Sequence, residues 1–98
     1  MTLTMEGHAN GTRTEAGDLV CCSASILAYT LGQRLVEMQE NRQCHGLVMK
    51  LDSGDALLAA TPRNRHTDTV RSAFDTVVAG FRLLEARYPE CVNVSQRE

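Results

Sequence analysis

The most regular pattern in the sequence lies in residues 67–87, where apolar side chains recur at steps of three and four residues. The residues that form this pattern are Val70, Phe74, Val77, Val78, Phe81 and Leu84. This spacing places them on one stripe of an amphipathic α-helix. Such a helix owes most of its stability to burial of its apolar stripe, so the rest of the chain must supply a surface that covers it. Tyr88 and Pro89 end the pattern.

A hairpin is predicted immediately before this helix. Segments 44–51 (CHGLVMKL) and 56–60 (ALLAA) flank the turn sequence DSGD. We expect Gly54 to adopt the positive φ that a tight hairpin turn requires, and Pro62 to end the second strand. In the first strand, the two-residue period places Leu47, Met49 and Leu51 on one face.

A second helix is predicted from about residue 19 to residue 39. Asp18 is a good N-cap residue, because its carboxylate can accept the backbone N–H of Cys21. The apolar residues that follow are Leu19, Val20, Ala24, Ile26, Leu27, Ala28, Leu31, Leu35 and Met38. In the first half they point almost all round the helix, so we expect that half to be largely buried. The glycine-rich segment 7–17 before it reads as a long loop, which in a compact domain is often functional.

Two further short strands complete the prediction, at residues 1–5 (MTLTM) and at residues 91–94 (CVNV). The order of elements is then strand, helix, strand, strand, helix, strand. This order predicts an α/β sandwich (α+β), with two helices on one face of a four-stranded sheet. A length of 98 residues suits a single domain spanning residues 1–98.

Composition excludes several classes of protein. The formal charge of −2 gives no broad basic field for nucleic acid, although a local basic patch is compatible with it. No apolar run has the length of a membrane span, and residues 1–6 do not resemble a secretion signal. We therefore expect a cytoplasmic protein with reduced thiols. No C-x-x-C pair or other metal-ligand spacing is present among the cysteines and histidines, so neither a metal nor another cofactor is predicted.

The four cysteines fall into two groups. Cys44 and Cys91 lie in predicted strands, where a reduced thiol packs as a small apolar group. Cys21 falls in the first turn of the predicted helix, where unpaired N–H groups and the helix dipole lower a thiol pKa. Cys22 lies in the same turn, rotated by about 100°. Helix periodicity alone does not decide which of these two thiols faces the loop.

Two motifs near the amino terminus are specific in combination: GHA at residues 7–9 and DLVC at residues 18–21, with a glycine-containing segment between them. Together with Ala24 and Ser25, they closely resemble the bacterial ribosomal-processing cysteine protease family (Prp). The segment AGFRLLEARYPECVNV, residues 79–94, is similar to the end of that family. The resemblance spans nearly the whole chain.

The resemblance implies a small cytoplasmic endopeptidase, a homodimer, that removes the N-terminal extension of a large-subunit ribosomal protein. By motif match, Cys21 corresponds to the nucleophile and His8 to the base of a Cys-His dyad. The positions that match supporting or substrate-binding residues are Gly7, Asp18 and Ser25. Cys22 stands where the family commonly has alanine. The residue types suit this chemistry, because a cysteine protease needs a thiolate, a histidine that exchanges protons with it and donors for the oxyanion.

Two other functions remain open on the residues alone. A non-catalytic ribosome-associated binding module is the first, because Arg63, Arg65 and Arg71 near the start of the second helix could meet RNA phosphates. In a chain that is acidic overall, nucleic acid is nevertheless not the expected partner. A thiol redox sensor that uses Cys21 and Cys22 is the second.

Overall fold

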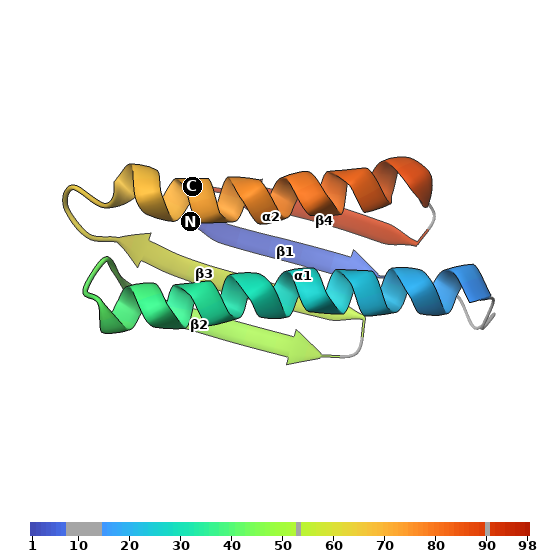
Figure 1. The fold of residues 1–98 in the computed structure, drawn as a ribbon, viewed down its shortest axis with the longest axis horizontal. Helices are drawn as coiled ribbons and strands as arrows, with labels where there is room; N and C mark the ends of the chain where they lie inside the picture. Colours follow the sequence, from blue (N-terminus) through green and yellow to red (C-terminus); the bar gives the residue numbers. More distant parts are fainter. Residues whose placement is uncertain (8–14, 53, 90) are drawn as a thin grey trace.

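The computed structural model describes residues 1–7, 15–52, 54–89 and 91–98, and for residues 15–21 it describes the backbone. The elements are β1 (Thr2–Gly7), α1 (Glu15–Glu40), β2 (Cys44–Asp52), β3 (Asp55–Pro62), α2 (Thr67–Arg87) and β4 (Val92–Arg97). Both helices lie on the same side of the sheet, with α1 over β2 and β3 and α2 alongside β4 (Figure 1). The expected order and architecture are therefore confirmed.

The four strands form one antiparallel sheet in the order β2-β3-β1-β4. The predicted hairpin joins β2 to β3, and Gly54 in its turn has a φ of +89°. The first strand becomes a central one, with Thr4 paired to Leu57 on β3 and to Ser95 on β4. The sheet thus presents two edges, β2 and β4.

Alternation along the strands assigns one sheet face to the core. On β1, Leu3 and Met5 are buried whereas Thr4 is exposed, because successive side chains point to opposite faces. The same alternation buries Ala56, Leu58 and Ala60 on β3, and Val92 and Val94 on β4.

The stripe predicted for residues 67–87 forms the buried face of α2. Its buried members are Val70, Phe74, Val77, Val78 and Phe81. Phe74 and Phe81 are wholly inaccessible to solvent and are the largest side chains of the core. The two helices approach closely at Gly80, where an added Cβ would lie 2.8 Å from Cδ2 of Leu27 on α1. A glycine at this position therefore lets the two helices pack together.

The beginning of α1 differs from the prediction. The helix starts at Glu15 rather than near residue 19, so Asp18 lies inside the first turn and is not the N-cap. Residues 15–17, expected in the loop, are helical. Glu15 and Ala16 are good helix formers, and one glycine at position 17 costs about 1 kcal/mol relative to alanine, which packing can offset.

The burial expected for the first half of α1 is also wrong. Ile26, a member of the apolar run, is 63% exposed, and Tyr29 on the same side of the helix is 57% exposed. The sheet and α2 together cover one side of α1 only. The outward side of this helix therefore keeps apolar side chains in contact with solvent.

The β4 edge is closed by side chains of α2. The main-chain N–H of Val94 donates to Oε2 of Glu85 at 3.1 Å, and the carbonyl of Val94 accepts from the guanidinium of Arg82 at 3.3 Å. Arg82 and Glu85 also form an ion pair at 3.0 Å. The hydrogen bond from the Val94 N–H, assisted by Arg82, lowers the pKa of Glu85 below its ordinary value. This pair satisfies main-chain groups that an added strand would otherwise use.

The Glu85 interaction predicts a pH-dependent stability. Because the pKa of Glu85 is lower in the folded protein, its contribution is fully present above the ordinary carboxyl pKa of about 4.3 and is lost as the pH falls through the folded-state value. Urea unfolding of wild type and Glu85→Gln should show the largest difference in unfolding free energy at neutral pH, shrinking below about pH 4. A difference that stays constant down to about pH 3 would contradict this assignment.

Candidate active site

Gly7, the first residue of the GHA motif, and the DLVC motif belong to elements that meet at one end of the molecule. Gly7 is the last residue of the central strand β1 and pairs with Val92. His8 directly follows it and lies outside the described residues. The start of α1 and the end of β1 are at the same end of the fold (Figure 1). The chain therefore reaches His8 from a strand held on both sides, which fixes the point from which that segment departs.

Cys21 lies further inside α1 than the sequence indicated. It comes six residues after the first helical residue, Glu15, and so belongs to the second turn. The four unpaired N–H groups of a helix are those of its first turn, and the dipole effect falls off within that turn. The expectation that Cys21 occupies the first turn is therefore wrong, and the helix terminus supports its thiolate less than predicted.

Helix geometry separates the two adjacent cysteines. Position 21 precedes Ala24 and Ala28 by three and seven residues and shares their stripe, and both alanines are buried. Position 22 shares the stripe of Ile26 and Tyr29, and Cys22 is exposed. The two positions therefore belong to different stripes of α1: position 22 lies on the outward face, and position 21 lies at a border, with the buried Ala24 and Ala28 on one side and the exposed Ser25 on the other.

Two of the predicted supporting residues also lie on α1. Asp18 is in its first turn, and Ser25 follows position 21 by one turn with an exposed side chain. Ser25 is thus accessible from solvent beside the candidate nucleophile. Gly7, Asp18, Cys21 and Ser25 all belong to β1 or to the first half of α1, whereas His8 lies outside the described residues.

The remaining thiols have structural surroundings. Cys44 opens β2, is fully buried, and its Sγ lies 3.7 Å from the carbonyl oxygen of Leu35. Burial raises the pKa of the Cys44 thiol, and the positive charge of Arg63 opposes this only in part. Cys91, expected in a strand, lies in the turn just before β4 and is half-buried. The buried, protonated Cys44 is poorly suited to act as a nucleophile.

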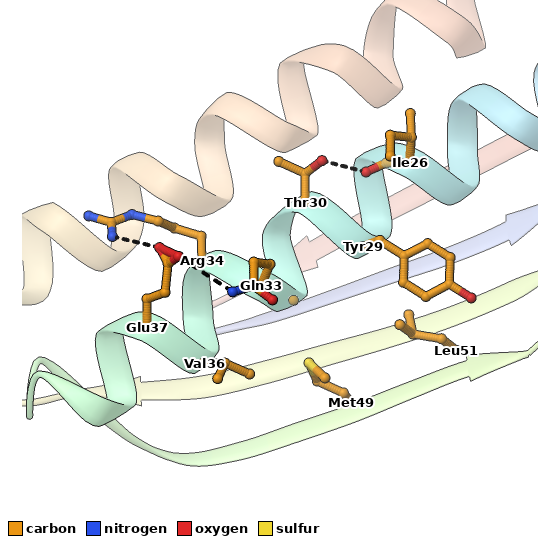
Figure 2. A pocket seen from close by; sticks show the side chains of 10 residues that line it. Ile26, Tyr29, Thr30, Gln33, Arg34, Val36, Glu37, Met49 and Leu51 are labelled. Atoms are coloured by element: carbon orange, nitrogen blue, oxygen red, sulfur yellow. Dashed lines mark hydrogen bonds and ion pairs between the residues drawn. The ribbon is translucent and has the colours of Figure 1, made fainter.

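A shallow apolar groove runs along α1 beside β2 (Figure 2). Ile26, Tyr29 and Val36 line it from the helix, and Met49 and Leu51 line it from the strand. Met49 comes so close to the helix that an added Cβ at Gly32 would lie 2.9 Å from its Sδ. The sequence signal for this groove is the apolar run of the first helix, which we interpreted as burial.

The β2 edge beside this groove is open. Asp52 and Asp55 close a two-residue hairpin turn and are therefore a hydrogen-bonded pair. Because hydrogen-bonded and non-hydrogen-bonded pairs alternate, the main-chain groups of Met49 and Leu51 point away from β3. The next outward N–H, that of Leu47, donates to Oε1 of Gln39 at 3.1 Å. Within the part of the chain that the structure describes, the main chains of Met49 and Leu51 have no such side-chain partner.

Comparison with known proteins defines the class. The chain belongs to the cysteine protease Prp family, whose model matches residues 1–93. Among solved structures, SMU.848 from Streptococcus mutans is similar, with a TM-score of 0.61 and 22% sequence identity over 91% of this chain and 76% of that chain. At this identity the likeness shows a shared fold. A comparison with curated proteins finds no match.

The described residues contain neither a metal-ligand cluster nor a helix suited to span a membrane. Across residues 1–7, 15–52, 54–89 and 91–98, no three histidine, cysteine or acidic side chains gather as metal ligands do. In the same residues, neither helix combines the length and the hydropathy that a bilayer span requires.

Exposure and pKa predict different reactivities for Cys22 and Cys44. In a Cys21→Ala variant, iodoacetamide near neutral pH should modify the exposed Cys22 and leave Cys44 unmodified, because the Cys44 thiol is buried and its pKa is raised. Unfolding in urea should make both thiols reactive. Peptide mass mapping measures each site, and native labelling of Cys44 as fast as that of Cys22 would refute the assignment.

Proposed function

We propose that this protein is a cytoplasmic cysteine endopeptidase that removes the N-terminal extension of a bacterial large-subunit ribosomal protein. Cys21 is the nucleophile and His8 is the base, within one domain that spans residues 1–98. The observation that carries the proposal is the family match over residues 1–93, which contains both the GHA and the DLVC motif. The placement of β1 and α1 supports it, because the end of β1, from which the GHA motif continues, and the start of α1 lie at the same end of the fold.

The reaction follows from the two side chains. His8 takes the proton of the Cys21 thiol, and the thiolate attacks the carbonyl carbon of the scissile peptide bond. The C–S bond forms, His8 returns the proton to the departing amine, and the C–N bond breaks. Water, deprotonated by His8, then attacks the thioester carbonyl, and the sulfur leaves as the thiol. No cofactor enters these steps.

The position of Cys21 increases the importance of His8. A thiol in the second turn of a helix receives little stabilisation from the helix terminus. Its thiolate then depends mainly on ion pairing with the protonated histidine, the arrangement that lowers a cysteine pKa most effectively in such dyads. We therefore assign His8 a role in forming the nucleophile as well as in protonating the leaving group.

The substrate is proposed to enter as an extended peptide between the segment that follows Gly7 and the first half of α1. Gly7 leaves room for close approach of the main chain at the end of β1. The exposed Ser25 hydroxyl, one turn after position 21, can donate to a substrate carbonyl. Asp18 is proposed to orient His8 or to bind a basic substrate side chain.

We further propose that two copies assemble through the open β2 edge. Outward main-chain groups of Met49 and Leu51 allow antiparallel pairing with a second β2, and the groove beside them offers exposed apolar side chains of Ile26 and Tyr29. The opposite edge is unsuited to this, because Glu85 and Arg82 occupy the main-chain groups of Val94. A symmetric pair is the common form of such an interface.

Replacement of the dyad should abolish cleavage. Cys21→Ala removes the atom that forms the acyl-enzyme, so cleavage of a peptide spanning the ribosomal processing site should disappear. Folding should persist, since alanine is the best helix former. His8→Ala should reduce kcat/KM by about 10²–10⁴-fold, because both proton transfers are lost.

Cys22→Ala is the matched control for this experiment, because it removes the neighbouring thiol and restores the residue common in the family. Its activity should be close to that of wild type. Cleavage by Cys21→Ala, or loss of activity in Cys22→Ala alone, would show that the nucleophile is misassigned. A folded wild type that cleaves no matched peptide would favour the non-catalytic binding module.

Assembly through β2 should be sensitive to a proline that removes an outward N–H. Met49→Pro deletes a donor on the open edge without removing a hydrogen bond to β3, and edge strands tolerate such a proline. Sedimentation of wild type should give twice the chain mass of 10.8 kDa, whereas Met49→Pro should give the single-chain mass.

Gln96→Pro is the matched control, because by the same alternation position 96 points outward from the β4 edge. This variant should sediment like wild type. Dimerisation of Met49→Pro, or loss of the dimer in Gln96→Pro only, would place the interface elsewhere. A wild type that stays monomeric at a concentration of about 100 μM would contradict the homodimer.

A further inference from the structure

Two turns meet at the end of the molecule opposite the start of α1. The turn after α1 covers residues 41–43, and the turn between β3 and α2 covers residues 63–66 (Figure 1). The main-chain N–H of Arg63 donates to the carbonyl of Gln43 at 2.9 Å and joins them. Because Cys44 pairs with Pro62 directly beside this bond, the sheet register fixes the two turns relative to one another.

Three exposed arginines lie on these turns: Arg42, Arg63 and Arg65. None of them forms an ion pair with any residue whose side chain the structure describes, whereas the arginines at positions 34, 71 and 82 each pair with a carboxylate. The turn sequences NRQCH and RNRH contain no acid. The flanking acids are Glu40, which is exposed, and Asp68, which is paired to Arg71. We call Arg42, Arg63 and Arg65 the arginine patch.

The backbone at two of these arginines favours a different residue. Gln43 N–H bonds to the Met38 carbonyl and Arg42 N–H bonds to the Gln39 carbonyl, which is the Schellman pattern that ends a helix. Arg42 has a φ of +60° at the position that glycine usually takes. Arg65 has a φ of +71° at the third position of a turn closed by the His66 N–H and the Arg63 carbonyl, where glycine or asparagine is usual.

Arginine at both positions therefore costs backbone energy without an ion pair to offset it. Strained residues of this kind gather at functional sites, where a side chain is needed despite its conformation. The stability of the fold does not account for the two arginines. A ligand that binds their guanidinium groups accounts for both arginines.

We propose that the arginine patch binds RNA phosphates. Guanidinium groups bind phosphate with two parallel hydrogen bonds, and three of them on adjoining turns can contact successive phosphates of one strand. The exposed Asn64 amide on the same turn adds a neutral donor suited to phosphate or sugar oxygens. That the RNA is ribosomal rests on the proposed function, whereas phosphate binding does not.

The patch and the candidate nucleophile lie at opposite ends of α1, about 30 Å apart at 1.5 Å per residue. The hairpin at the far end exposes Asp52 and Asp55 instead of arginines. RNA held at the patch would therefore leave the end that carries Cys21 free. A ribosomal protein bound to the same RNA would present its extension there at a raised local concentration.

The test uses the full chain with Cys21→Ala, so that binding is measured without cleavage. Fluorescence anisotropy with a labelled RNA stem-loop of about 20 nucleotides gives Kd at several salt concentrations. Changing both Arg42 and Arg65 to glycine should weaken binding at least about tenfold and lower the slope of log Kd against log salt by about 2. The melting temperature should not fall, because glycine suits both positive φ values.

Two comparisons keep the test specific. Changing both Lys50 and Arg87 to glutamine also removes two exposed positive charges that have no ion pair among the described side chains, but on β2 and at the end of α2 rather than on the two turns, and should leave Kd within about twofold. Changing Arg42 and Arg65 to lysine retains the charge and should recover most of the salt slope. An equal loss of affinity in both double variants would overturn the proposal.

Two other results would also overturn it. Polyglutamate bound as tightly as RNA would assign the patch to an acidic protein, and absence of RNA binding at low salt would remove the site. Peptide cleavage by wild type without RNA tests the proposed function separately. Binding without cleavage would leave the RNA site standing and refute the peptidase.

Discussion

Burial of a single face of one sheet under two helices determines the rest of this structure. The inward face of α1 changes along its length: Ala24 and Ala28 are buried toward its beginning, and Leu31, Leu35 and Met38 are buried in its second half. Phe74 and Phe81 are the largest buried side chains of α2. Large buried side chains therefore hold α2 and the second half of α1, whereas small ones line the part of α1 that follows position 21. The beginning of α1 extends past the β2–β3 hairpin (Figure 1). Its first turns therefore lie at the same end of the fold as the end of β1, where the GHA motif begins.

In the proposed functions, this arrangement separates peptide cleavage from RNA binding along one helix. The DLVC motif occupies the beginning of α1 and the apolar groove its middle, and the arginine patch lies on the turn that follows its end and on the adjoining turn. A helix is stiff over this length, so each region keeps a fixed distance from the others. A small chain can in this way carry several functional surfaces without a second domain, because its elongated shape, 45 Å by 21 Å by 16 Å, keeps them apart.

The sequence predicted the elements with strong local signals and failed where tertiary context decides. The stripe through Phe74 and the turn at Gly54 each follow from one periodicity or one backbone requirement, and both are confirmed. The start of α1 was misplaced because Asp18 is a favourable N-cap residue, whereas the helix in fact begins three residues earlier, at the helix formers Glu15 and Ala16. The exposure of Ile26 could not be predicted, since an apolar side chain looks the same in the sequence whether or not another element covers it.

The candidate site likewise combines features that the sequence predicts with features that only the tertiary structure shows. The motifs assign the nucleophile to Cys21 and the base to His8, which stays a prediction, and the structure corrects the helix turn that holds Cys21. Which stripe of the helix each adjacent cysteine occupies required the burial of Ala24 and Ala28. Arg42 had no sequence signal beyond the absence of glycine at the end of a helix. Only its φ shows that arginine occupies an unfavourable position.

The closed β4 edge limits how far copies of this chain can grow into larger structures. A sheet with two open edges can add strands at both sides, and repeated addition produces a fibre. In this molecule the Arg82–Glu85 pair occupies the main-chain groups of Val94 on the β4 edge, so an added strand would pair less readily there than at β2. Two-fold pairing then ends the process after one step. The Arg82–Glu85 ion pair on the surface of α2 therefore disfavours fibre formation through the β4 edge.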